Sequence, residues 1–285
     1  MLRGRARELG AFLRARRNEL RPEKVGLTVW DEPRRVPGLR REEVAGLAAI
    51  STDYYTRIEQ ARIAVTPSVL AAVASALRLD DAQRHYVFGL LGQHSGQERR
   101  PQAQSVQPQL RQLLKGLTTI PALVLGRYMD VLAWNPLAAR LVTDFARVPR
   151  RERNWVRLIF LDPRMREVHA DWEDVAQQAV AQLRMEASVN VGSARLQALV
   201  GELAERDAVF RAWWSSYQVA VEVRGTTIEH PVVGTLQLES STLASTVDPD
   251  QRLVTWTARP GSSADRRLQE LSQLPAEAVR TAVAS

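Results

Sequence analysis

The chain of 285 residues contains no cysteine. Disulfides, thiolate metal ligands and cysteine nucleophiles are therefore excluded, and this absence is typical of a reducing intracellular compartment. No apolar run approaches the roughly 18 residues of a membrane-spanning helix, and the first stretch, MLRGRARELGAFLRARR, lacks the apolar core of a secretory signal. We therefore expect a soluble, cytoplasmic protein without a membrane span.

Lysine is almost as scarce, since Lys24 and Lys115 are the only two lysines among 39 basic residues. The net charge is +7, and the basic excess lies mainly in residues 1–93, which hold 16 basic against 11 acidic side chains. This balance favours an acidic partner such as nucleic acid or an anionic membrane surface. Arginine in particular can hold a phosphate or a guanine edge through two parallel hydrogen bonds.

Two short helical patterns meet in the stretch REEVAGLAAISTDYYTRIEQAR. Apolar residues spaced for helix–helix contact run through both, and Ser51 is placed to cap the second helix with its hydroxyl. The other side chains of that helix form one polar stripe, because residues four apart share a helix face. The stripe consists of Thr52, Asp53, Thr56 and Arg57. A helix-turn-helix unit with such a stripe can enter the major groove of DNA, whereas a small bundle with a solvated polar face is the alternative.

The pattern EEVAxLAxxSxxYYxRIEQ, with a further helix beginning at Pro67, resembles the Xre-type helix-turn-helix family of bacterial repressors. The resemblance covers about the first ninety residues and implies DNA binding. By position in the family's motif, the expected base contacts are Thr52, Asp53 and Arg57, and the expected phosphate anchors are Gln60, Arg62, Arg40 and Arg41. The family usually has Gly where this chain has Ala49 and Ala61, so these alanines must accept a backbone shape that Gly adopts more easily.

The composition changes after a polar, aperiodic stretch, GQHSGQERRPQAQSVQP, which predicts a linker. Beyond it, PALVLGRYMDVLAW predicts two short strands, and Asn135-Pro136 opens a helix that runs to about Phe145. Helical patterns follow to about Trp214, and three alternating segments then predict antiparallel strands. We expect an all-α, lambda-repressor-like domain followed by an α+β domain with an antiparallel sheet. The predicted boundaries are 1–93 for the DNA-binding domain, 94–110 for the linker, 111–262 for the second domain and 263–285 for a C-terminal tail.

Several short motifs of the second domain resemble, in order, the ligand-binding domain of MmyB-like transcription regulators. They are PALVLGRYMDVLAWNPLAARL, RNWVRLIFLDP, DWEDVAQQAVAQLR, HPVVGTLQLE and RLVTWTARPGS. This resemblance implies a PAS-like fold in an intracellular regulator, and some members of the family hold a fatty acid in this domain. We expect that the protein requires no cofactor.

A fatty acid needs an apolar cavity wall and a polar partner for its carboxylate, because an unpaired buried carboxylate is prohibitively costly. The candidate wall residues are Trp134, Trp155, Leu158, Phe160, Leu161, Leu183, Trp213 and Trp214. The candidate head-group partners are Arg184, Asn154, Asn135 and His230. For each of these, a place in the ordinary core or an ordinary salt bridge is the alternative.

Catalytic and metal patterns are absent from the sequence. The four histidines, His85, His94, His169 and His230, show no metal-ligand spacing, and no Walker A, GxGxxG or GxSxG stretch occurs. Haem held by His230 or His169 is an open alternative. We predict no enzyme, no metal site and a homodimeric transcription regulator that binds double-stranded DNA. The alternative function is a constitutive dimeric DNA-binding protein whose second domain only dimerises or docks a partner and holds no ligand.

Overall fold

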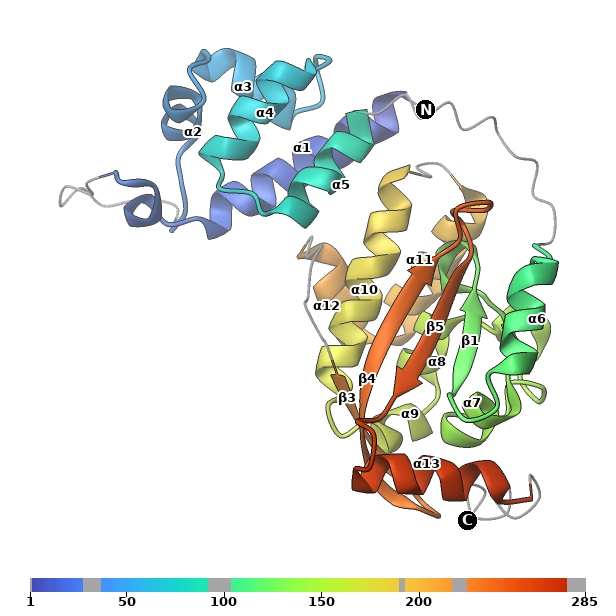
Figure 1. Ribbon diagram of the computed structural model, residues 1–285. Coiled ribbons are helices and arrows are strands. Elements are labelled where there is room, and N and C mark those ends of the chain that lie inside the picture. Colours follow the sequence, from blue (N-terminus) through green and yellow to red (C-terminus); the bar gives the residue numbers. More distant parts are fainter. Residues whose placement is uncertain (1, 28–36, 92–103, 190–192, 217–224, 276–285) are drawn as a thin grey trace. The chain divides into compact units, whose positions relative to one another are not determined.

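The computed structural model describes residues 2–27, 37–91, 104–189, 193–216 and 225–275 (Figure 1). Its contacts divide the chain into two compact units. The first unit comprises 1–98, 184–198 and 212–220, and the second comprises 99–183, 199–211 and 221–285. Most of the predicted linker, the predicted strand residues 219–224 and the last ten residues of the predicted tail lie outside the described residues.

Helices build the N-terminal part of the first unit. They are α1 (Leu2–Glu19), the 3-10 turn η1 (Pro22–Val25), α2 (Arg41–Leu47), α3 (Thr52–Glu59), α4 (Pro67–Ala76) and α5 (Asp81–Leu91). Side chains cap two of these helices at their starts, because Thr66 Oγ1 accepts from Val69 N at 3.4 Å and Asp80 Oδ1 accepts from Gln83 N at 2.7 Å. These bonds satisfy backbone donors that the first turn of a helix leaves unpaired.

The core of this part is apolar and packed around α1 and α3. Phe12 and Tyr86 are fully buried with ring centroids 5.0 Å apart, and Tyr55 and Ile58 of α3 join them. Gly10 lets α1 approach α3, since a Cβ at this position would lie 2.3 Å from the Glu59 carbonyl oxygen. The close approach fixes the orientation of α3 relative to the helix that supports it.

The second part of the chain is α+β, and its first half carries two strands. The elements there are α6 (Pro108–Gly116), β1 (Ala122–Leu125), the 3-10 turn η2 (Arg127–Met129), β2 (Val131–Trp134), α7 (Pro136–Leu141) and η3 (Arg150–Glu152). Helices and the remaining strands follow as α8 (Trp155–Leu161), α9 (Arg164–Val168), α10 (Trp172–Val189), α11 (Ala194–Arg206), α12 (Ala208–Ser215), β3 (Gly225–His230), β4 (Gly234–Ala244), β5 (Arg252–Thr257) and α13 (Ser263–Gln273).

The five strands of the described chain form one antiparallel sheet in the order β2-β1-β5-β4-β3 (Figure 1). The two strands before the helical block therefore pair with the three after it through β1 and β5. This arrangement confirms the predicted α+β class and the predicted division of strands. The pairing of β1 with β5 joins strands that are far apart along the chain, and no local sequence pattern specifies such a pairing.

Both faces of the central strands are covered. On one face, Ala122, Val124 and Leu253 pack with Leu114 of α6. On the other face, Leu123 and the alternate residues of β5 point toward a cavity that α10 also lines. Successive side chains of a strand point to opposite faces, so one short strand can contribute to both layers.

Two helices differ from the sequence expectation. Asn135 caps a helix as predicted, since its Oδ1 accepts from Ala138 N at 2.9 Å, but α7 ends at Leu141. The predicted tail begins as helix α13, whose Leu268 and Leu271 are buried. Among the described helices, none has the length and apolar character needed to cross a membrane.

Candidate functional site

Helix α3 presents the predicted polar stripe on its open side. The Ser51 hydroxyl accepts from Tyr54 N at 3.1 Å, so the serine caps the helix as the sequence predicted. Thr52, Asp53 and Arg57 are exposed, whereas Thr56 is half-buried. The arrangement gives a capped helix with one solvated face of the kind that enters a DNA groove.

Arg57 and Asp53 pair with each other on this stripe. The Nη2 atom of Arg57 lies 2.8 Å from Asp53 Oδ2, and their side chains are 54% and 69% exposed. Exposed pairs four residues apart on a helix contribute only about 0.3–0.5 kcal/mol, so DNA can displace the carboxylate from the guanidinium. Asp53 thus holds Arg57 along the stripe when no DNA is bound.

The alanines on either side of α3, at the positions where the resembling family usually has Gly, adopt left-handed backbone conformations. Ala49 in the α2–α3 turn has φ of 54°, and Ala61 after α3 has φ of 55°. A Cβ atom makes this region costly for every residue except Gly. Ala49 and Ala61 therefore each bear the strain of a conformation that Gly would adopt more easily.

A buried carboxylate fixes the C-terminal end of α3. Glu59 Oε1 accepts from Arg17 Nε at 2.6 Å, and Glu59 Oε2 accepts from Arg41 Nε at 2.7 Å. Arg17 also donates to the Leu39 carbonyl at 2.8 Å. Burial raises the pKa of Glu59, but the hydrogen bonds and charges of the two arginines outweigh burial, and its pKa is lowered. This three-residue clamp was not predicted from the sequence.

The predicted phosphate anchors occupy different environments. Gln60 and Arg62 are exposed just beyond α3, where a phosphate can reach them. Arg40 lies 3.6 Å from Glu42 and its backbone N–H donates to Glu43, so it opens α2. Arg41 is engaged by Glu59. Phosphate contacts by these four residues stay predictions.

A cavity of the second unit, named here the arginine cavity, has a volume of about 610 Å³. It lies among α7, the segment that follows it, α8 and α9. Its apolar wall includes Val142, Val148, Leu158 and Leu161. Its charged lining consists of Arg140, Arg147, Arg157, Arg164, Arg206, Asp144, Glu152 and Asp162.

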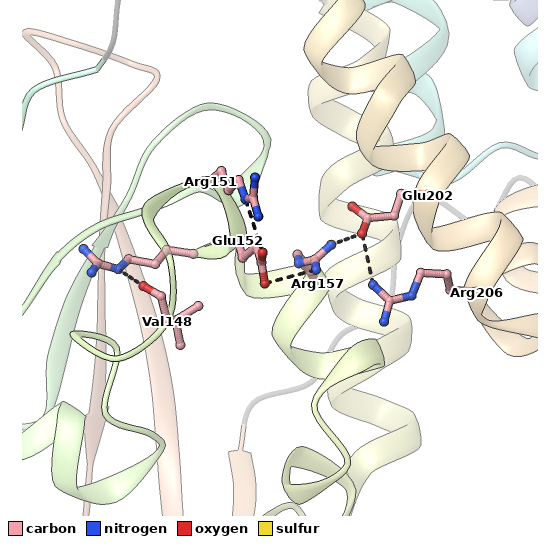
Figure 2. Close-up of polar contacts among 7 residues, drawn as sticks. Val148, Arg151, Glu152, Arg157, Glu202 and Arg206 are labelled. Atoms are coloured by element: carbon pink, nitrogen blue, oxygen red, sulfur yellow. Dashed lines mark hydrogen bonds and ion pairs between the residues drawn. The ribbon is translucent and has the colours of Figure 1, made fainter.

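Ion pairs neutralise most of this charge. Figure 2 shows Arg157 between two carboxylates, with Nη2 at 3.3 Å from Glu152 and Nη1 in contact with Glu202. Arg206 lies 3.1 Å from the same Glu202, whose pKa is lowered by its hydrogen bond to Arg157 and by both arginines. Such a network holds the arginines in place and reduces the cost of gathering them.

A second cavity of about 260 Å³, named here the sheet cavity, lies between the sheet and α10. Its apolar and aromatic lining consists of Leu123, Leu125, Met129, Trp155, Val175, Ala179, Val254 and Trp256. Its polar lining consists of His169, Gln178, Gln182, Thr226, Ser240, Thr242 and Arg252, with Gly225 at one edge. Neither His169 nor Arg252 had been predicted as a head-group partner.

Of the predicted ligand residues, Leu158 and Leu161 line the arginine cavity. Trp134 packs against Phe145 with tilted rings at 5.2 Å between centroids, and Phe160 packs on Trp172 and Phe210. None of the predicted head-group partners lines either cavity.

The predicted polar partners are engaged elsewhere. Asn135 Nδ2 donates to the Leu117 and Ile120 carbonyls, and Asn154 Nδ2 donates to the Tyr128 carbonyl at 2.7 Å. These two asparagines close turns.

Four further predicted residues are placed by their surroundings. His230 Nδ1 accepts from Val232 N at 3.2 Å, so the ring belongs to the β3–β4 turn. Arg184 lies over the Trp214 ring at 4.1 Å and 3.1 Å from the Glu8 carboxylate, within the first unit. Leu183 is fully buried and Trp213 is half-buried on α12. A ligand contact by these residues stays a prediction.

No group of three or more acidic, histidine or cysteine side chains that could hold a metal ion occurs in the described part of the chain.

The two parts define a protein that joins a DNA-binding module to a domain with ligand-sized cavities. Residues 8–87 match a helix-turn-helix domain model, and residues 106–271 match the MmyB-like transcription regulator ligand binding domain. The second match covers more than half of the 285 residues, and the chain belongs to this family. It is a transcription regulator with a DNA-binding and a ligand-binding domain. No curated protein matches the chain.

Proposed function

We propose that this regulator senses a long-chain fatty acid, held in the arginine cavity. The observation that carries the proposal is the combination in one cavity of an apolar wall, to which Leu158 and Leu161 contribute, and five arginines. A volume of about 610 Å³ lies inside the usual range for small-molecule sites, about 300–1,000 Å³. Each methylene buried there contributes about 0.8 kcal/mol, so chain length sets the affinity.

Arg140 is the best head-group partner for the carboxylate. Its Nη1 donates to the Ser272 carbonyl at 3.0 Å, while its Nε is buried and has no partner among the residues that the structure describes. A buried N–H without an acceptor is destabilising, and a carboxylate oxygen would satisfy it. The other arginines of the wall, such as Arg164 at 2.7 Å from Asp162, already have carboxylate partners.

The test measures hexadecanoic acid and hexadecanol binding to delipidated protein by thermal shift and calorimetry. Arg140→Gln should weaken the acid more than the alcohol. Arg151→Gln is the matched control, because this arginine is 86% exposed next to the cavity and does not line it. A protein that shows no melting shift with any saturated acid of about ten to eighteen carbons, the chain lengths suited to such a cavity, would contradict the fatty-acid proposal.

The DNA-binding domain completes the proposed mechanism. We assign it to the Xre type and the second domain to a PAS-like fold, in a homodimer that acts on DNA in the cytoplasm without a required cofactor. One recognition helix contacts too few base pairs to find one site in a genome, so the operator should be an approximate palindrome. Sedimentation should show two chains, and a monomer bound tightly to an asymmetric site would contradict this assignment.

The alternative is a constitutive DNA-binding dimer whose second domain only dimerises or docks a partner. Exposed apolar side chains such as Leu243 at the end of β4 and Val247 beyond it favour a contact surface there. In that case DNA affinity would be the same with and without the acid, and charged substitutions at Leu243 would lower the dimer population.

A further inference from the structure

The sheet cavity contains a histidine whose tautomer is fixed by its neighbours. The Thr226 hydroxyl donates its only hydrogen to Asp171 Oδ1 at 3.0 Å. Its oxygen lies 3.2 Å from His169 Nδ1 and can therefore only accept there. Nδ1 must carry the ring proton, which leaves Nε2 as an acceptor.

That acceptor is buried and unused. His169 is 1% exposed, and its Nε2 has no hydrogen-bond partner among the described residues. Burial lowers the pKa of His169 to about 4, so the ring is neutral near pH 7 although Asp171 acts in the opposite direction. A buried acceptor without a donor destabilises the fold unless a bound molecule supplies the donor.

Aromatic walls surround this end of the cavity. The Trp155 and Trp256 ring centroids lie 5.8 Å apart, and the Trp155 ring meets His169 edge-on at 6.5 Å. Leu123 and Val254 continue the wall along β1 and β5, where they are register partners. Offset and edge-to-face packing on such rings favours a flat aromatic guest over an alkyl chain.

The charges near His169 also determine which kind of molecule can bind in the sheet cavity. Asp171 behind His169 and the lone pair of Nε2 both disfavour an anion at this end, whereas a neutral hydroxyl or N–H group completes the Asp171–Thr226–His169 chain of hydrogen bonds. Arg252 lines the same cavity four residues from Trp256 along β5, a separation of about 13 Å in a strand. The backbone of Arg252 therefore lies well away from Trp256 along this wall.

We propose that the sheet cavity binds a small, neutral aromatic molecule, a phenol or an N–H heteroaromatic, which donates a hydrogen bond to Nε2 of His169. The cavity volume of about 260 Å³ is below the usual range of about 300–1,000 Å³ and suits a compact guest. Haem, the alternative ligand for the His169 nitrogen, is far larger than this cavity. The site shares no lining residue with the arginine cavity, so it does not depend on the fatty-acid proposal.

The test compares 4-methylphenol with 4-methylanisole, which has the same ring and no donor. Binding to the full chain is followed by tryptophan fluorescence and calorimetry. The phenol should bind about tenfold more tightly than the anisole, as expected for one hydrogen bond to a neutral acceptor. His169→Phe should remove this preference, and Thr226→Val should reduce it because the ring is then free to place its proton on Nε2. His85→Gln, an exposed histidine on α5, should keep the preference.

Nitrogen NMR of the histidine rings gives a second measurement that needs no variant. In the free protein at pH 7, Nδ1 of His169 should carry the proton and Nε2 should not, and 4-methylphenol should shift the Nε2 resonance. Equal affinity for the two probes, no binding of 4-methylphenol at millimolar concentration, or a proton on Nε2 in the free protein would each overturn the proposal.

Discussion

Arginine serves opposite purposes in the two domains. In the DNA-binding domain, Arg17 and Arg41 surround one buried carboxylate, while Arg62 stays exposed beyond α3. In the ligand-binding domain, Arg157 and its neighbours line a cavity and are held by carboxylates at its rim. Buried pairs fix the end of the helix that carries the polar stripe, whereas in the proposed function the arginine cavity, whose charge is mostly neutralised by ion pairs, offers Arg140 to an anion. The comparison separates structural arginines from functional ones.

Removal of the buried Glu59 carboxylate tests the structural role of Arg17 and Arg41 and should have the largest effect. Glu59→Gln leaves the Arg17 guanidinium buried without a counter-charge, and it should lower the free energy of unfolding by about 3–5 kcal/mol. Asp53→Asn, at the exposed pair with Arg57, is the control and should cost less than about 1 kcal/mol. Urea denaturation of both variants measures the difference, and equal losses would refute the structural role of the clamp.

Low pH should destabilise the ligand-binding domain because His169 is buried in its neutral form. Because the pKa of His169 is lowered to about 4, the unfolded chain takes up a proton before the folded protein does as pH falls below about 6.5. Stability from this group is complete above pH 6.5 and declines as pH falls, by about 2 kcal/mol at pH 5. His230, whose pKa is also lowered by burial, acts in the same direction. His169→Gln should flatten the stability profile over this interval, and an unchanged slope would count against a neutral buried ring.

The exposed arginines should affect DNA binding without lowering stability. Arg57→Ala should reduce discrimination between sites by about 1–3 kcal/mol if it holds a guanine through two hydrogen bonds. Arg62→Ala should weaken all sites alike and lower the salt slope by about one, because it loses one phosphate contact. Selection from random duplexes and salt titrations distinguish these effects. An unchanged preferred sequence for Arg57→Ala would place the base contacts elsewhere.

The smallest predicted effect concerns the strained turn. Left-handed backbone costs a non-Gly residue about 1–2 kcal/mol, and Gly loses about 0.5–1 kcal/mol more conformational entropy on folding. Ala49→Gly, at φ of 54°, should therefore raise stability by up to about 1 kcal/mol. Ala71→Gly inside α4 is the control and should lower stability by about 0.5–1 kcal/mol. Thermal unfolding of the two variants checks the opposite signs.

Local signals in the sequence predicted the elements of both domains. Ser51 and Asn135 cap the helices that follow them, because a short polar side chain before an apolar periodic run has a specific role at a helix start. The alanines at positions 49 and 61 indicated a left-handed backbone through comparison with the Gly of a resembling family. The match with the MmyB-like ligand-binding domain confirms the family that the ordered motifs suggested.

The cavities could not be predicted in the same way. The wall of the sheet cavity joins His169, Thr226 and Trp256, which three separate elements supply, and no spacing along the chain specifies their meeting. Arg184 is a predicted head-group partner, yet the structure places it on Trp214. Arg140 was overlooked because an arginine in a short helix is ordinary until its Nε is found buried. Burial and pairing of charges are properties of the folded chain.

Coupling between the two domains is the central claim of the proposed function, and one reciprocal measurement tests it directly. DNA affinity is measured with and without saturating hexadecanoic acid, on a duplex obtained by selection, and acid affinity is measured with and without that duplex. If bound acid changes the affinity of the protein for DNA by some factor, bound DNA must change the affinity for the acid by the same factor. For typical allosteric proteins this factor is about 5- to 150-fold. Equal factors different from one are predicted. DNA affinity that is unchanged by an acid that binds would contradict the account.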